Sequence, residues 1–199
     1  MLSQTAIAQD IRAMKIEPVA LDNAYVRVNR NAATCAVAKS GTCEDRVILA
    51  MGNIEVQSAG KTRKMKRGDV AVFGADVSFD APSNGAFYEI VLKPGHPAVK
   101  APTEIIAAPN NKPVFDGPKF FIYEEKLPVG ATRERHSHSQ RVEIRLNNGP
   151  MLHQWVWTDG RVDESEPGIV NWREPIIHTV HNIGTQPLRN FILEMKPKG

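Results

Sequence analysis

The feature that most limits the fold of this chain is a succession of short β-type segments. Each half of the sequence holds segments rich in Val, Ile, Phe and Tyr, such as Val47–Ala50 and Phe87–Leu92, separated by Gly, Pro, Asn and Asp. Helical periodicity is scarce outside Ala6–Met14, where we expect a short helix. Short strands at this spacing are typical of antiparallel sandwiches and barrels. The sequence therefore predicts an all-β fold.

The succession of segments occurs twice, which indicates an internal repeat. The end of the first half, Ile90-Val-Leu-Lys-Pro94, is similar to Leu193-Glu-Met-Lys-Pro197 at the end of the second half. A Pro-rich segment, Pro94–Pro113, lies between the halves and indicates a linker. We therefore predict four parts: an N-terminal arm (1–16), a first barrel (17–94), a linker (95–112) and a second barrel (113–199).

Composition excludes some classes of partner. The 199 residues contain no apolar run long enough for a membrane span, and the net charge of +3 is too small to indicate nucleic-acid binding. The densest basic run, Lys61–Arg67, is either an anion-binding patch or a turn followed by an exposed strand. We favour the exposed strand, because such runs usually form a solvated face.

The two cysteines bear on the cellular compartment. Cys35 and Cys43 flank a turn-like segment, so a hairpin there would bring them within disulfide reach; two free buried thiols are the alternative. Thr5–Gln9 has the small residues of a signal cleavage site, and it is either the remnant of a signal peptide or a plain arm. These features favour a periplasmic or secreted protein and leave the cytoplasm open.

The strongest chemical signal is a set of three histidines and one glutamate. His136 and His138 point to the same face of a strand, because side chains alternate faces. Glu143 lies an odd number of residues further on, so a turn or bulge near Ser139–Arg141 must return it to that face. His178 completes a nitrogen and oxygen shell suited to Fe, Mn, Ni, Cu or Zn. We interpret the set as a metal site; surface histidines beside a solvated glutamate are the alternative.

The same residues carry a resemblance to a known superfamily. Gly130-x5-His136-x-His138-x4-Glu143-x5-Gly149 resembles the first cupin motif, and Pro175-Ile-Ile-His178-x3-Asn182 resembles the second, although the usual Pro-x-Gly before the histidine is absent. The resemblance extends over the chain and implies a bicupin, two tandem double-stranded β-helix (jelly-roll) barrels. Dimerisation is common among proteins of this resemblance, so the resemblance also implies a possible homodimer.

The first half lacks the ligand residues. An ungapped alignment of the two halves pairs Lys39 with His136, Gly41 with His138 and Arg46 with Glu143. A shift of the alignment by one residue pairs Asp45 with Glu143 instead. Phe79 stands in the place of His178. An apolar ring cannot coordinate a metal, so we expect Phe79 to fill a structural barrel.

Other side chains near the motifs have less specific roles. We predict that His181 points away from the metal and that Asn182 stabilises a turn. A further set either lines a substrate pocket or belongs to the core and the solvated surface: His153, Trp155, Trp157, Arg141 and Arg145.

Three functions are compatible with these motifs. The first is a metal-dependent enzyme that resembles the dioxygenases, lyases and isomerases of the superfamily, with Fe or Mn favoured and Glu143 as a proton acceptor for a small organic substrate. The second is a non-catalytic binder of the metal or of a small ligand. The third is a structural bicupin in which the ion only stabilises the fold.

Overall fold

The structure is a computed structural model that describes residues 17–36, 45–107, 111–147, 153–157 and 162–197. Sixteen strands and no helix occur among these residues, so the all-β prediction is confirmed. Accordingly, this part of the chain contains no helix able to cross a membrane. The expected helix at Ala6–Met14 lies outside the described residues.

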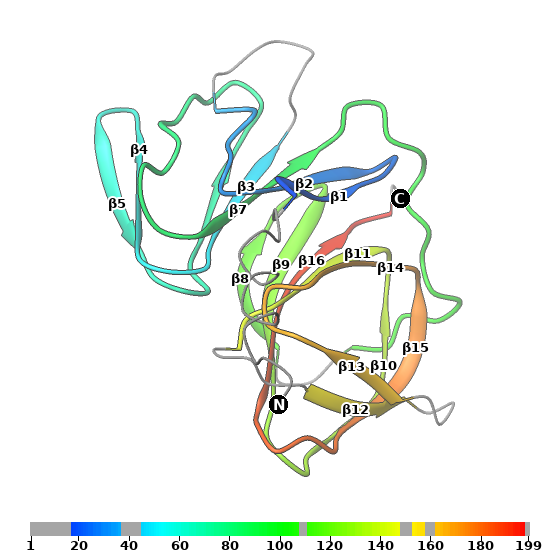
Figure 1. The fold of residues 1–199 in the computed structure, drawn as a ribbon. Coiled ribbons are helices and arrows are strands. Elements are labelled where there is room, and N and C mark those ends of the chain that lie inside the picture. Colours follow the sequence, from blue (N-terminus) through cyan, green and yellow to red (C-terminus); the bar gives the residue numbers. More distant parts are fainter. Residues whose placement is uncertain (1–16, 37–44, 108–110, 148–152, 158–161, 198–199) are drawn as a thin grey trace, which may run out of the picture.

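The N-terminal half forms one five-stranded antiparallel sheet and one hairpin. The sheet order is β1-β2-β7-β3-β6, and β4 pairs with β5 (Figure 1). The expected exposed strand in the basic run is β5, whose first four residues are exposed. The strands are β1 Val19–Asp22, β2 Val26–Arg30, β3 Arg46–Ala50, β4 Ile54–Ser58, β5 Lys61–Met65, β6 Val70–Phe73 and β7 Phe87–Leu92.

The C-terminal half forms a second pair of sheets. One has the order β14-β11-β16-β9-β8 and the other β10-β15-β12-β13. These are the strands: β8 Lys112–Asp116, β9 Phe120–Leu127, β10 Thr132–His138, β11 Arg141–Arg145, β12 His153–Trp157, β13 Val162–Ser165, β14 Val170–Arg173, β15 Ile176–Asn182 and β16 Leu188–Met195.

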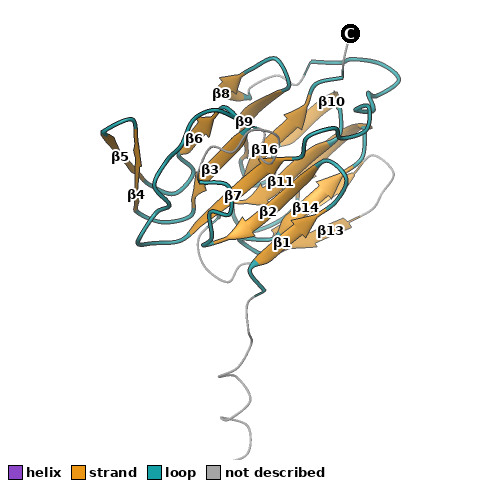
Figure 2. Ribbon diagram, turned by 90° about the horizontal axis from the view of Figure 1, so that it is seen from above, coloured by secondary structure: helices purple, strands orange, loops and turns teal. Residues whose placement is uncertain are grey.

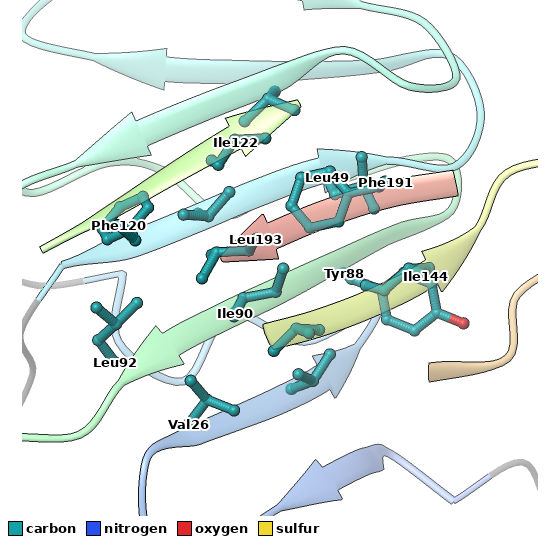
Figure 3. Close-up of a cluster of buried hydrophobic side chains, with 14 of the residues drawn as sticks. Val26, Leu49, Tyr88, Ile90, Leu92, Phe120, Ile122, Ile144, Phe191 and Leu193 are labelled. Atoms are coloured by element: carbon teal, nitrogen blue, oxygen red, sulfur yellow. The ribbon is translucent and has the colours of Figure 1, made fainter. Parts of the chain in front are cut away.

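The two five-stranded sheets pack against each other and form the largest apolar core. Figure 2 shows them as neighbouring layers, and Figure 3 shows their side chains meeting between the layers. Leu49 and Ile90 from the first sheet lie in one cluster with Ile144 and Leu193 from the second, and all four are fully buried. Strands β3 and β7 are buried along their whole length, because one face meets this core and the other faces inward.

The inward face of the N-terminal sheet is apolar around Phe79. The Phe79 ring stacks on Phe73 with centroids 4.3 Å apart, and both belong to a buried cluster that also contains Ile48. The prediction that Phe79 fills this half is therefore confirmed. Arg46 enters the same interior, where its guanidinium group donates to the carbonyl oxygens of Cys35, Gly74 and Val77.

The strand register corrects the alignment of the two halves. The Gly68 amide donates to the Ala50 carbonyl, and the Gly168 amide donates to the Arg145 carbonyl in the same way. Counting two residues back from each acceptor places Ile48, not Arg46 or Asp45, at the position of Glu143. The ungapped alignment was wrong by two residues because it matched Gly52 to Gly149, whereas Gly52 follows Ile48 by four residues and Gly149 follows Glu143 by six. Lys39 and Gly41, its proposed counterparts of the histidines, lie outside the described residues.

The structure describes only one of the two cysteines that were predicted to form a disulfide. Cys35 is disulfide-bonded in the structure, whereas its predicted partner Cys43 lies outside the described residues.

Candidate metal centre

Three histidines meet inside the C-terminal pair of sheets. His136 and His138 lie on β10, and His178 lies on the neighbouring strand β15 directly opposite His136. Opposite residues of paired strands project to the same face, which here is the interior. The exposed fractions are 0%, 4% and 3% for His136, His138 and His178, so all three imidazoles are shielded from water.

The three rings present their nitrogens to one small region. Each histidine offers one ring nitrogen, and these three atoms lie within 4.8 Å of one another. The Nε2 atoms of His136 and His178 are 3.0 Å apart. The His138 ring stands nearly perpendicular to both other rings. Within the described residues, these histidines form the group of potential ligands that could hold an ion.

Hydrogen bonds determine which nitrogen of two of these rings is available. The His136 Nδ1 atom lies 2.8 Å from the Glu134 carbonyl oxygen, and the His138 Nδ1 atom lies 3.0 Å from Glu194 Oε2. A carbonyl or carboxylate oxygen only accepts, so each Nδ1 carries the proton and donates it. Each Nε2 therefore keeps its lone pair for a ligand bond.

Burial keeps the imidazoles neutral. Desolvation lowers the pKa of His136, His138 and His178, and neighbouring positive groups act in the same direction on His178. The Nε2 atoms of His136 and His178 lie 3.0 Å apart, close enough for one ring to donate to the other, and a cation bound between them takes the place of that proton. Metal–nitrogen bonds of about 2.0–2.1 Å at right angles place two ligand atoms about 3 Å apart. The donor set and the spacing therefore fit a divalent transition metal.

A second layer of polar groups holds His138. The Glu194 carboxylate on β16 accepts from the Ser139 amide at 2.6 Å and from the Tyr123 hydroxyl at 3.1 Å, in addition to the bond from His138. Tyr123 and Glu194 are both buried. The sequence analysis did not identify Tyr123 and Glu194 as partners of His138. The signal that could have found them is Glu194 itself, a charged residue inside the otherwise mostly apolar segment Phe191–Met195.

Glu143 lies on β11 and projects into the same interior. The chain leaves β10 at His138 and enters β11 at Arg141, which confirms the expected break between the histidines and Glu143. Glu143 lines a very small cavity, about 10 Å³, together with His138 and His178. Its carboxylate lies 3.9 Å from Arg145 Nη2 and 3.5 Å from Arg173 Nε. It is outside the three-histidine group, so its role as the fourth ligand stays a prediction.

Further buried charges surround this cavity. Glu125 forms an ion pair with Arg133 and accepts from Asn190 Nδ2 at 2.8 Å. Burial is the largest single influence and opposes ionisation of Glu125, but Arg133, His138 and Asn190 together outweigh it, and the pKa of Glu125 is lowered. Arg141 and Arg145 are also buried, and Arg141 Nη1 donates to the carbonyl oxygens of Ser139 and Glu174. The interior around the histidines is therefore densely charged.

The remaining predicted residues fall on β12 and β15. His181 bonds Thr132 through Nδ1 and is on the opposite face from His178, and Asn182 bonds the carbonyl oxygens of Leu127 and Gln186 at a turn. These two observations agree with the predictions for both residues. Strand β12 pairs with β15 in the same sheet, but the side chains predicted to line a substrate pocket there lie outside the described ones: His153, Trp155 and Trp157.

Comparisons with known proteins identify the fold. No protein-family model matches the sequence, and no curated protein matches it. Solved structures do match. AerE from Microcystis aeruginosa has a TM-score of 0.59 at 16% identity and covers 92% of this chain and 95% of its own. A cupin 2 conserved barrel domain protein from Leptotrichia buccalis has a TM-score of 0.55 at 14% identity over 89% and 87% of the two chains.

A third similar structure is a salicylate 1,2-dioxygenase from Pseudaminobacter salicylatoxidans. Its TM-score is 0.53 at 10% identity, over 87% of this chain and 74% of that one. At these identities the likeness concerns the fold. The chain therefore has the jelly-roll cupin fold, with a three-histidine cluster in its C-terminal half.

Proposed function

We propose that the chain is a bicupin whose C-terminal barrel binds one divalent transition metal. His136, His138 and His178 are the ligands, and Glu143 is the fourth. The observation that carries the proposal is the convergence of three buried imidazoles whose donor atoms lie within 4.8 Å of one another. Such a cluster is costly to bury without a ligand, because polar groups away from water need partners.

We further propose that the metal serves catalysis on a small organic substrate. A bound transition metal acts as a Lewis acid or lowers the pKa of a bound water. Glu143 accepts a proton in this proposal at its carboxylate oxygens, which lie 3.9 Å from Arg145 Nη2 and 3.5 Å from Arg173 Nε. Glu194 holds the His138 ring in one orientation. Buried walls around the histidines limit access of water.

The favoured reaction class is that of a dioxygenase, with a lyase or isomerase as related alternatives, and Fe or Mn as the metal. Support comes from the fold shared with salicylate 1,2-dioxygenase, a variant of which has been solved with gentisate. We propose a periplasmic or secreted location on the disulfide at Cys35, because disulfides persist in oxidising compartments.

A non-catalytic metal binder is the second candidate. The observation in its favour is the size of the cavity next to His138, His178 and Glu143, which at about 10 Å³ has room for about one water molecule. A protein that only holds an ion needs no larger space, whereas an enzyme needs room for its substrate.

The test is elemental analysis of protein purified without added metal. We expect about one equivalent of a transition metal, lost in a double variant with His136→Ala and His178→Ala. His181→Ala is the matched control, since it removes an imidazole from the same strand but from its other face, and it should keep the metal. Absence of metal from the unmodified protein would refute the site. If metal is present, oxygen consumption with a panel of aromatic hydroxy acids separates the enzyme from the binder.

A further inference from the structure

A cavity of about 470 Å³ lies at the seam between the two C-terminal sheets. Strand β10 is the edge of one sheet and β8 is the edge of the other, and among the described residues these two strands do not pair with each other. Residues 102–107 of the linker run across the seam. They are attached there because the Ser137 amide donates to the Ile106 carbonyl at 3.0 Å and the Ile106 amide donates to Ser137 Oγ at 2.7 Å.

The walls of this seam cavity are mostly apolar. Ile105 lies at its rim with 87% of its surface exposed, which makes it the most exposed large apolar side chain among the described residues. A volume of this size is in the usual range for small-molecule sites, roughly 300–1,000 Å³. The apolar lining residues include Pro102, Ile105, Ile106, Ala107, Phe121 and Met195.

The polar end of the seam cavity contains the Glu194 carboxylate, which can accept one more hydrogen bond. Tyr123, His138 and Glu194 all line it. The two oxygens of Glu194 accept three hydrogen bonds, from the Ser139 amide, the Tyr123 hydroxyl and the His138 ring. A carboxylate has about four acceptor positions, so about one is left for a donor on a ligand.

The seam cavity is separate from the metal centre. His138 contributes to both: its Nδ1 atom bonds Glu194, and its ring stands nearly perpendicular to the rings of His136 and His178. The linker residues that cover the seam cavity do not line the small cavity beside Glu143.

We propose that the seam cavity is a second binding site, which takes a compact aromatic molecule carrying one hydroxyl group. The aromatic body lies between the linker and strand β9, against Ile106 and Phe121. The hydroxyl donates to Glu194. The site does not require the metal, so it goes beyond the proposed function and is tested independently of it.

The test uses 1-naphthol and the full chain as purified. We expect 1-naphthol to shift the amide NMR signals of residues 103–107 and 194–196. Ala107→Phe fills the cavity from its exposed rim and should weaken binding at least about tenfold, since it removes the apolar contact area. Ala101→Phe is the control: it adds the same ring at an exposed linker position that does not line the cavity, and it should bind 1-naphthol unchanged.

A second ligand tests the hydrogen bond to Glu194. 1-Methoxynaphthalene has the same ring system without a donor, and it should bind about fivefold more weakly than 1-naphthol. Equal binding of 1-naphthol by the Ala107→Phe and Ala101→Phe variants would overturn the proposed site. So would shifts confined to other parts of the chain, or no detectable binding with 1-naphthol at about 1 mM. Equal binding of the two naphthalenes would overturn the role of Glu194.

Discussion

Replacing Glu194 with Gln should weaken metal binding without removing a metal ligand. Three donors converge on the two carboxylate oxygens of Glu194: the Ser139 amide, the Tyr123 hydroxyl and the Nδ1 proton of His138. Glutamine has nearly the same shape but only one acceptor oxygen, and its amide adds two protons. At least one of the three donors then faces another donor, and His138 loses a charged partner.

The size of this effect follows from the role of such outer partners. Removing a carboxylate that orients a metal-binding histidine typically lowers metal affinity about 10–100-fold, or about 1.4–2.8 kcal/mol. Competition of the protein with a chelator for Co(II) measures the affinity, and the visible spectrum of bound Co(II) reports any change in ligand geometry. Glu55→Gln is the control, because it makes the same chemical change on the exposed hairpin β4–β5.

A Glu194→Gln protein that binds Co(II) within twofold of the unmodified chain, with the same spectrum, would refute this reasoning. It would mean that packing alone orients His138. A large loss of affinity in the Glu55→Gln protein would equally remove the argument, since that residue has no contact with the histidines.

Two further predictions concern stability. Phe79→Ala removes a buried ring that stacks on Phe73, and it should lower the free energy of unfolding by about 3–5 kcal/mol in urea while leaving the metal content unchanged; a fall in metal content would show that the halves are not separable in this way. Metal-free protein should lose stability as the pH falls below about 6.5, because burial lowers the pKa of His136, His138 and His178 in the folded state, so the unfolded chain binds more protons. His138 and His178, whose pKa lies well below its ordinary value, each contribute at most about 1.4 kcal/mol between pH 7.5 and 5.5, and urea titrations at these two pH values measure the difference; equal stability at both would contradict the burial argument.

Sequence patterns predicted the all-β fold and the common face of His136 and His138. The alternation in His136-x-His138 was sufficient, because a strand places such a pair on one face whatever surrounds it. Phe79 was recognisable for a similar reason: it holds the place of His178 in a repeated pattern. Both features depend on local geometry and on the repeat, which a sequence displays directly.

Features that depend on pairing between distant strands were not predictable in the same way. The counterpart of Glu143 was misplaced by two residues, because only the hydrogen bonds from Gly68 and Gly168 define the register of the two halves. The bond from His138 to Glu194 joins residues 56 positions apart, and no local pattern encodes it. Nor does any pattern before folding show that Leu49 and Leu193 meet in one core.

The packing of the two five-stranded sheets has a consequence for how such a chain changes in evolution. On β11, Val142 and Ile144 face the shared core, whereas Arg141, Glu143 and Arg145 face the metal centre. Residues that pack the two sheets together and residues that face the metal centre thus alternate along one strand. Inward residues can be exchanged while the outward ones keep the sheets together. The N-terminal half illustrates one outcome, with Ile48 inward and the neighbouring Val47 and Leu49 still in the common core.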